Sequence, residues 1–148
     1  AKPVLGTNPT EKLLTNGIRG SLKYSDFEWC SWADNDSVSF KIDLLKLEML
    51  NTLILGCITN NGMAIHKPAS VRVEVSDDNS KFREAVVQSF TSEEIFREGN
   101  FIENLSLKLG GTQARYVRVT AKGPGVCPAS HVRPGQTSRI FFDEVMLE

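Results

Sequence analysis

Three segments between the apolar stretches of this 148-residue chain carry most of the side chains that could do chemistry. They are residues 20–36, which are rich in aromatic side chains, residues 59–68 and residues 122–139. Amide, imidazole and guanidinium groups suit the vicinal hydroxyls of a sugar, and an exposed aromatic ring can stack on the apolar face of a sugar ring. The candidate ligand-binding residues are therefore Trp32, Asn60, Asn61, His66, His131 and Arg133.

These residues also have a purely structural interpretation. Trp29 and Trp32 flank Cys30 and Ser31 just before a strand pattern, so both can equally close the end of a hydrophobic core. The dipeptide Asn61-Gly62 is typical of a tight turn. Exposure of Trp32 would favour sugar binding, and burial of Trp32 would favour the structural role.

The sequence contains none of the motifs of the common enzyme classes. It has no Gly-x-Ser-x-Gly elbow, no glycine-rich phosphate loop and no His-Glu-x-x-His. Its paired carboxylates, 77–78 and 93–94, fall in polar turns rather than in a shielded acid–base pair. Zinc is not expected, because His66 and His131 have no neighbouring Cys or His at ligand spacing. We therefore expect no catalytic residue in this chain.

Composition excludes several classes of partner. With 17 basic and 18 acidic residues the net charge is −1, and the basic residues are scattered, so no strong field favours nucleic acid or an anionic membrane. The longest apolar run, 53–58, is far shorter than a transmembrane helix. The three cysteines, Cys30, Cys57 and Cys127, allow either one disulfide with a free thiol or three buried thiols. We expect the isolated chain to be a monomer.

Alternating apolar and polar residues dominate the chain and predict strands. The pattern is clear at 38–44, 71–75 and 116–120. Helical signals are short, with one turn expected at 92–96. Many short strands without long helices predict an all-β, antiparallel sandwich or barrel, with residues 1–148 forming one domain. Further strands are expected at 53–55, 85–90, 105–109 and 140–147.

Three separated segments resemble the coagulation-factor V/VIII C-type, or discoidin-like, domain. The opening segment 13–21 is followed by Trp29, Trp32 and the strand at 38–44, while 68–82 resembles the central strand and turn of that family. The closing strands are matched by 114–119 and 142–145. The resemblance covers nearly the whole chain in the right order. It implies a jelly-roll β-sandwich of the galactose-binding-domain-like type.

A narrower resemblance is to the accessory domains of bacterial hexosaminidase-type glycoside hydrolases. It rests on 14–21 and on Gly125-Val126-Cys127-Pro128 before the last strand. It implies a fragment of a larger secreted, periplasmic or cell-surface protein whose catalytic domain lies outside this chain. Relatives hold structural Ca²⁺ between the opening turn and the last strand, and the matching positions here are Asn16, where the family has an acidic residue, and Glu144.

Two functional hypotheses follow. The first is a non-catalytic carbohydrate-binding module that binds a glycan weakly, with segments 20–36, 59–68 and 122–139 gathered at one end of the sandwich. The second is a structural or protein-interaction domain that packs on a neighbouring catalytic domain and binds no small ligand.

Overall fold

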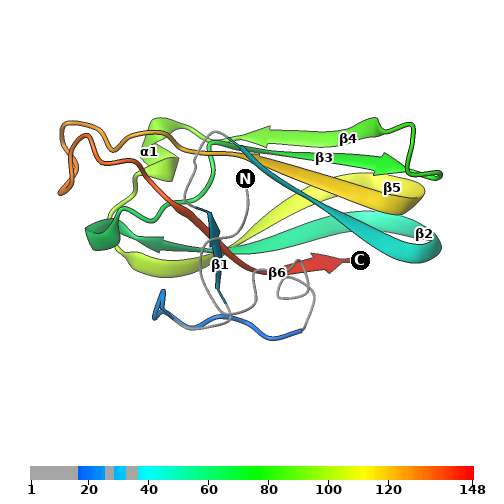
Figure 1. The fold of residues 1–148 in the computed structure, drawn as a ribbon, viewed down its shortest axis with the longest axis horizontal. Coiled ribbons are helices and arrows are strands. Elements are labelled where there is room, and N and C mark those ends of the chain that lie inside the picture. The colour runs from blue at the N-terminus through cyan, green and yellow to red at the C-terminus, as the bar shows by residue number, and fades with distance from the viewer. Residues whose placement is uncertain (1–16, 26–28, 33–36) are drawn as a thin grey trace.

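The computed structural model describes residues 17–25, 29–32 and 37–148. Figure 1 shows an elongated two-layered β-structure with one short helix at one end and strand bends at the other. The elements in chain order are β1 (Cys30–Trp32), β2 (Ser37–Asn60), the 3₁₀ turn η2 (Asn61–Met63), β3 (Ser70–Ser76), β4 (Arg83–Ser89), α1 (Ser92–Ile95), β5 (Asn100–Lys122) and β6 (Ile140–Leu147).

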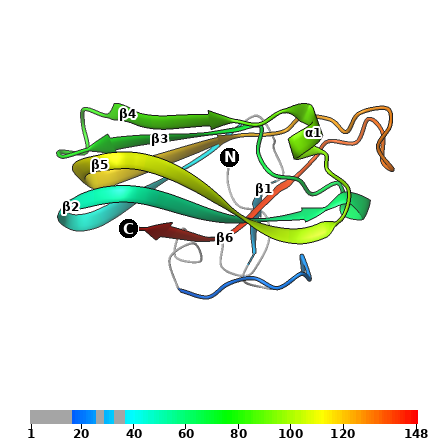
Figure 2. The ribbon, with the colours of Figure 1, turned by 180° about the vertical axis from the view of Figure 1, so that it is seen from behind.

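The two longest strands, β2 and β5, are each folded back so that they run through both layers (Figures 1 and 2). They pair with each other in antiparallel register from Ser37 with Lys122 to Asn60 with Asn100. The register shifts between residues 43 and 48 of β2, where Leu45 adopts a left-handed φ of 70°. On β5 the bend falls at Gly110 and Gly111, whose φ values of 70° and 73° suit glycine.

The bends turn one continuous hydrogen-bonded ladder into a sandwich. Its strand order is β1-β6-β2-β5-β3-β4, and every named pair is antiparallel. One layer contains the start of β2, the end of β5, β3 and β4, and the other contains the rest of β2 and β5 with β6 and β1. The prediction of an all-β antiparallel sandwich is confirmed.

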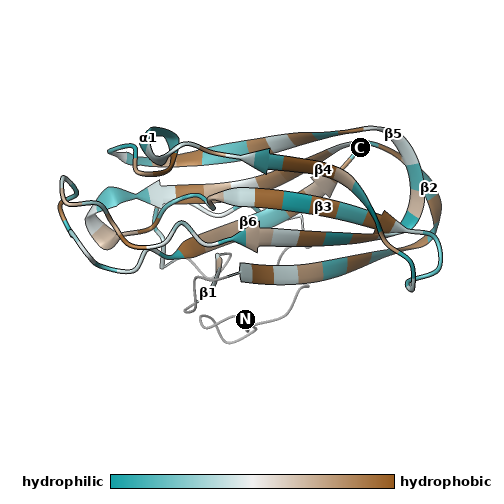
Figure 3. Ribbon diagram, turned by 90° about the horizontal axis from the view of Figure 1, so that it is seen from above, coloured by the Kyte–Doolittle hydropathy of each residue, from teal (hydrophilic) through white to brown (hydrophobic). Residues whose placement is uncertain are grey.

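Inward-facing side chains of both layers form one hydrophobic core. Along β2 and β3 the apolar and polar residues alternate, as the colour bands in Figure 3 show, because successive side chains of a strand point to opposite faces. Ile42 is half-buried against this core. The remaining residues expected to point inward are all buried: Val38, Phe40, Val71, Val73, Val75, Val117 and Val119.

Trp32 also lies in this core, which corrects the prediction that it offers an exposed platform. Its side chain is 3% exposed and its ring packs edge-on against Phe142 at 5.5 Å between centroids. The physical reason is its place on β1, which pairs with β6 at the edge of a layer and directs Trp32 inward. Trp29 is buried too, in a second cluster with Ile58, Ile65 and Phe141.

The three cysteines are buried free thiols. Burial raises the pKa of the Cys30 thiol to about 11 and raises that of Cys57 further, so both behave as apolar core side chains. This outcome selects the second of the two alternatives that the sequence left open. Among the described residues, no helix is long and apolar enough to cross a membrane.

Candidate functional site

Segments 59–68 and 122–139 meet at the end of the sandwich that carries α1 (Figures 1 and 2). Main-chain hydrogen bonds join them: the His66 N–H donates to the Arg139 carbonyl at 3.1 Å, and the Arg139 N–H donates to the Ala64 carbonyl at 2.9 Å. The buried Ser138 hydroxyl donates to the same Ala64 carbonyl at 3.2 Å. These bonds fix both segments to each other without a continuous sheet.

The second of these segments is a small ribbon rather than a loose loop. Val126 and Thr137 form an antiparallel bridge, and the Cys127 N–H donates to the Gln136 carbonyl at 2.8 Å. The Gly135 N–H in turn donates to the Cys127 carbonyl at 2.9 Å. The ribbon therefore holds Cys127 firmly and presents residues 128–134 at its tip.

The other segment begins with the tight turn that the Asn-Gly dipeptide indicates. The Asn60 side chain caps η2 by accepting a hydrogen bond from the Met63 N–H at 3.3 Å, and Ala64 adopts a left-handed φ of 55°. The Asn61 N–H donates to the Gly99 carbonyl at 3.1 Å, which ties the turn to the connection between α1 and β5. The Oδ1 atom of Asn61 has no hydrogen-bond partner among the described residues. Asn60 is thus structural, and the unpartnered Oδ1 atom of the half-buried Asn61 is itself buried.

Both histidines lie at the junction of these segments. The Nε2 atoms of His66 and His131 are 2.9 Å apart, and the Phe96 ring packs edge-on against both imidazoles. His66 is fully buried and His131 is half-buried. Burial, and to a lesser extent the neighbouring His131, lowers the pKa of His66 to about 4. A neutral, buried His66 cannot reach a ligand at the surface and instead orients His131.

Arg133 is exposed at the tip of the ribbon. Its Nε atom donates to the Gly62 carbonyl, and its main-chain N–H donates to Nδ1 of His131 at 2.9 Å. The guanidinium is therefore positioned across the gap between the two segments. Of the predicted ligand-binding residues, the structure brings together Asn60, Asn61, His66, His131 and Arg133, and only Trp32 lies elsewhere.

The described part of segment 20–36 contributes beneath this surface rather than on it. Tyr24 and Met63 pack on the second hydrophobic cluster, which contains Trp29 and Ile65. The Trp29 indole N–H donates to the Ser21 carbonyl at 2.8 Å. The prediction that three segments gather at one end is confirmed for 59–68 and 122–139. Of the first segment, Tyr24 and Trp29 lie beneath them, whereas Cys30 and Trp32 lie in the main core.

The calcium prediction concerns Asn16, which lies outside the described residues, and Glu144. The Glu144 carboxylate is buried, and both of its oxygens accept from the Gly17 N–H at 3.2 Å. The neighbouring Asp143 is bound by the Arg19 guanidinium at 2.8 Å. Ca²⁺ takes six to eight oxygen ligands, and the described residues around Glu144 do not assemble such a cage. Calcium at Asn16 and Glu144 stays a prediction.

Two residues of this end were not anticipated. Phe96 was expected only as part of a helical turn, and it contacts both histidine rings from the C-terminal end of α1. Cys127 lies four residues before His131, and its sulfur lies within 4.8 Å of one ring nitrogen of His66 and one of His131, which are equally close to each other. The expectation that no Cys lies at ligand spacing from these histidines was wrong, and the spacing of four between Cys127 and His131 was the signal for the cluster.

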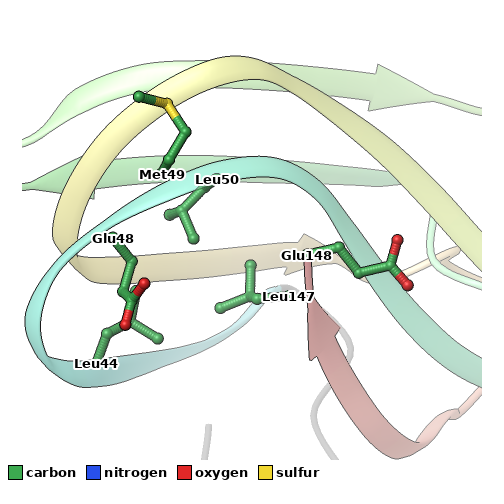
Figure 4. Close-up of a pocket in the computed structure, with 6 residues that line it drawn as sticks. All are labelled: Leu44, Glu48, Met49, Leu50, Leu147 and Glu148. Carbon is green, nitrogen blue, oxygen red and sulfur yellow. The ribbon is translucent and has the colours of Figure 1, made fainter.

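A different hollow lies at the opposite end, beside the bends of β2 and β5 (Figure 4). It has a volume of about 310 Å³, and in Figure 4 the Leu50 and Leu147 side chains point toward each other across it. Nearby on the same bend, Leu45, Leu47 and Met49 are exposed by 78%, 51% and 57%. Glu48 and Glu148 also line the hollow, so exposed apolar side chains lie beside carboxylates at this end.

Connecting segments held by a rigid scaffold are where functional residues concentrate. The F5/8 type C domain matches residues 5–133, and the chain belongs to that family. A search of curated protein sequences found no match.

Solved structures with the same fold include several modules of carbohydrate-active proteins. The CBM32 of AlyQ in complex with 4,5-unsaturated mannuronic acid has a TM-score of 0.57 at 18% identity, covering 93% of this chain and 84% of that one. The C-terminal domain of a chitobiase from Bacteroides fragilis has a TM-score of 0.58 at 16% identity, covering 100% and 88%. A putative chitobiase fragment from Bacteroides thetaiotaomicron has a TM-score of 0.57 at 18% identity, covering 81% and 67%. At these identities the likeness is one of fold.

Proposed function

We propose that this chain is a non-catalytic carbohydrate-binding accessory module of an extracellular or envelope glycoside hydrolase. The observation that carries the proposal is the exposed guanidinium of Arg133, which is held at the junction of segments 59–68 and 122–139 by its hydrogen bond to the Gly62 carbonyl. Arg133 and His131 lie on the same ribbon tip, beside the turn that contains Asn61. The fold shared with modules of carbohydrate-active proteins, such as the CBM32 of AlyQ, supports the same function.

In this proposal the Arg133 guanidinium, exposed at the tip of the ribbon, meets adjacent hydroxyls of one sugar residue. His131 positions Arg133 by accepting its main-chain N–H. Asn60 shapes the turn through its hydrogen bond to Met63, and His66 holds His131 from within. The half-buried ring of Phe96 takes over the role first assigned to Trp32, because it is the aromatic ring beside His131. Its edge offers a smaller apolar contact than an exposed indole would.

A site made of a few polar groups and one half-buried aromatic ring should bind a glycan weakly. The sugar buries little apolar area and exchanges hydrogen bonds with water for hydrogen bonds with protein at small net gain. We expect a dissociation constant of roughly 0.1–1 mM, equivalent to about −4 to −5.5 kcal/mol. Tethering to a catalytic domain or repetition of the module would then supply avidity.

Titration calorimetry with hexosamine- and galactose-containing oligosaccharides tests the proposal. The wild-type chain should bind at least one of them at millimolar concentration, and Arg133→Ala should weaken binding about tenfold or more, because hydrogen bonds to charged groups contribute roughly 1.5–3 kcal/mol. Lys46→Ala, an exposed change near the opposite end, is the matched control and should bind as wild type does. Absence of heat with every glycan, or full binding by Arg133→Ala, would contradict the proposed site.

The second hypothesis, a structural domain that packs on its neighbour, is favoured by one observation of its own. Three apolar side chains are exposed at the bend of β2, beside the hollow of Figure 4: Leu45, Leu47 and Met49. Exposed apolar clusters of this kind mark contact surfaces. In this alternative the bend end packs on the catalytic domain of the parent protein and no glycan is bound.

Hydrogen exchange distinguishes the two functions. If the bend packs on a neighbouring domain, amides of residues 44–50 should exchange more slowly in the full-length parent protein than in the isolated chain. Amides of residues 129–136, at the opposite end, serve as the internal reference and should exchange equally in both. Equal exchange rates for residues 44–50 in the parent protein and in the isolated chain would contradict the packing function.

A further inference from the structure

Three side chains with strong affinity for transition metals converge beside the proposed glycan surface. His66 precedes β3, while Cys127 and His131 belong to the ribbon formed by residues 123–139. One nitrogen of each imidazole and the Cys127 sulfur lie within 4.8 Å of one another. Cys127 is 2% exposed, His66 is fully buried and His131 is half-buried at the edge of the cluster.

We propose that His66, Cys127 and His131 bind one zinc ion, which links the ribbon of residues 123–139 to the segment before β3. Two imidazoles and a thiolate form a borderline-soft ligand set that suits Zn²⁺ and discriminates against Ca²⁺ and Mg²⁺, which take oxygen ligands. Three protein ligands leave a fourth tetrahedral position for water. The inference is independent of the proposed glycan function, since it needs no sugar.

The spacing of the ligand atoms is close to what the ion requires. Zn–N bonds of about 2.0–2.1 Å and a Zn–S bond of about 2.3 Å, in a tetrahedron, place the two nitrogens about 3.3 Å apart and each nitrogen about 3.6 Å from the sulfur. The nitrogens of His66 and His131 are 2.9 Å apart, and no separation within the cluster exceeds 4.8 Å. Small side-chain rotations therefore suffice to bring all three ligands onto the ion.

The main chain holds two of the ligands in place and leaves the third adjustable. The main chain of His66 is bonded to Arg139, and that of Cys127 is bonded to Gln136 and Gly135. His131 sits at the half-buried tip of the ribbon, so its ring can turn and the ion has a way in from solvent. Preorganised ligands of this kind lower the entropic cost of binding.

The hydrogen bonds also define where the protons go. Nδ1 of His131 accepts the Arg133 N–H, so the neutral ring carries its proton on Nε2 and donates it to Nε2 of His66. His66 then carries its own proton on Nδ1, which is already the form that binds metal through Nε2. On binding, the His131 proton moves to Nδ1, the Arg133 N–H turns to water, and the Cys127 thiol releases one proton to solvent.

Cobalt substitution tests the site on the whole chain. Titration of the reduced protein with Co²⁺ should produce a thiolate-to-cobalt charge-transfer band and intense visible d–d absorption, saturating at one ion per chain. Zn²⁺ should abolish both signals by displacement, and Ca²⁺ should not. Cys127→Ser should lose the charge-transfer band, and His131→Gln should weaken Co²⁺ binding about 100-fold or more, because it removes a direct ligand.

Val132→Ala is the matched control, because Val132 follows His131 on the same ribbon and is 64% exposed. This variant should bind Co²⁺ as wild type does. A wild-type chain without the charge-transfer band would overturn the proposal, and so would a Cys127→Ser chain that keeps it.

A second measurement uses only the wild-type chain and does not depend on the folding of any variant. Zn²⁺ should protect Cys127 from alkylation by iodoacetamide, as read by mass spectrometry of the modified peptides. The melting temperature should rise by several degrees with excess Zn²⁺ and return to its starting value with a chelator. Alkylation of Cys127 at the same rate with and without Zn²⁺ would rule the site out.

Discussion

Gly56 of β2 lies where the opening segment crosses the sheet. A Cβ atom at this position would overlap the Asp143 carboxylate and the Arg19 guanidinium, which are bonded to each other at 2.8 Å. The same carboxylate accepts the Gly20 N–H at 2.9 Å, and the same guanidinium donates to the Asn104 side chain at 2.7 Å. Because Gly56 has no side chain, Asp143 and Arg19 can approach the β2 main chain closely. Their ion pair connects the opening segment to β6, and the Arg19 bond to Asn104 connects it to β5.

Gly56→Ala should expel this ion pair and destabilise the fold by roughly 2–4 kcal/mol, because a buried charge loses its partner. Chemical denaturation measures the change. The control is Gly62→Ala, whose Cβ atom would meet nothing closer than Asn60 Oδ1 at 3.7 Å and should change stability by less than about 0.5 kcal/mol. Equal effects of the two changes would show that the close approach at Gly56 is unimportant.

Asp43 joins the bend of β2 to β5 through a two-pronged ion pair. Its oxygens accept from Nε and an Nη of Arg115 at 2.8 and 3.0 Å, and one of them also accepts the Leu45 N–H at 2.8 Å. The Arg115 hydrogen bonds, followed by that of Leu45, hold the pKa of Asp43 below its ordinary value.

The lowered pKa has a definite sign for acid stability. A carboxyl group whose pKa is lower in the folded state stabilises the fold above its ordinary pKa, near 4, and this contribution is lost as the pH falls through the folded value. Asp43→Asn should therefore be less stable than wild type at pH 7, and the difference should shrink below about pH 3. Urea denaturation at several pH values measures it. A stability difference between wild type and Asp43→Asn that does not change with pH would show that it does not arise from the lowered pKa of Asp43.

At the scale of the elements, the period-2 pattern was the most reliable signal. Strands were correctly predicted at 38–44, 71–75, 116–120 and 140–147, because one face of each is buried and the other is solvated. The pattern could not reveal that β2 and β5 each continue through a bend into the opposite layer. That result depends on Leu45, Gly110 and Gly111 adopting positive φ values, which alternation does not encode.

Phe40 tests the inward face of β2. Its side chain is 5% exposed and it pairs with Val119 across the ladder. Phe40→Ala should lower the free energy of unfolding by about 3–5 kcal/mol, because it removes buried area and leaves a cavity. Lys41→Ala, one residue on and facing solvent, should stay within about 0.5 kcal/mol of wild type. Both values come from denaturant melts, and similar losses for the two variants would contradict the assigned face.

Leu45 is strained in the bend, since L-residues with a branched or bulky side chain rarely adopt a positive φ. Leu45→Asn should be neutral or raise stability by up to about 1 kcal/mol, because Asn tolerates the left-handed conformation and the lost side chain was exposed. Leu45→Val should lower stability by about 1 kcal/mol through its β-branched side chain. Thermal unfolding ranks the three proteins, and a Val variant more stable than the Asn variant would contradict the strain.

At the scale of the molecule, the sequence was a good guide to which segments carry polar chemistry and a poor guide to which side chains reach the surface. Residue type pointed to Asn61, His131 and Arg133, and the structure brings these together. Residue type could not show whether the Trp32 indole lies at the surface or in the core, because its direction is set by the pairing of β1 with β6. It also missed that His66 would be fully buried, since burial there arises from a contact with a segment 65 residues away.

The doubled course of β2 and β5 through both layers has a kinetic consequence. Their paired residues are 40 positions apart at Asn60 and Asn100 but 85 apart at Ser37 and Lys122. Loop closure costs more entropy as the sequence separation of the paired residues grows. Pairing of β2 with β5 should therefore begin near Asn60 and Asn100, continue to the bends, and form last in the other layer, near Ser37 and Lys122. Neither layer can then be completed alone, and refolding should be a slow event, on the scale of milliseconds to seconds. Stopped-flow fluorescence of the two buried tryptophans, Trp29 and Trp32, would follow it, and microsecond refolding would contradict this nested order of assembly.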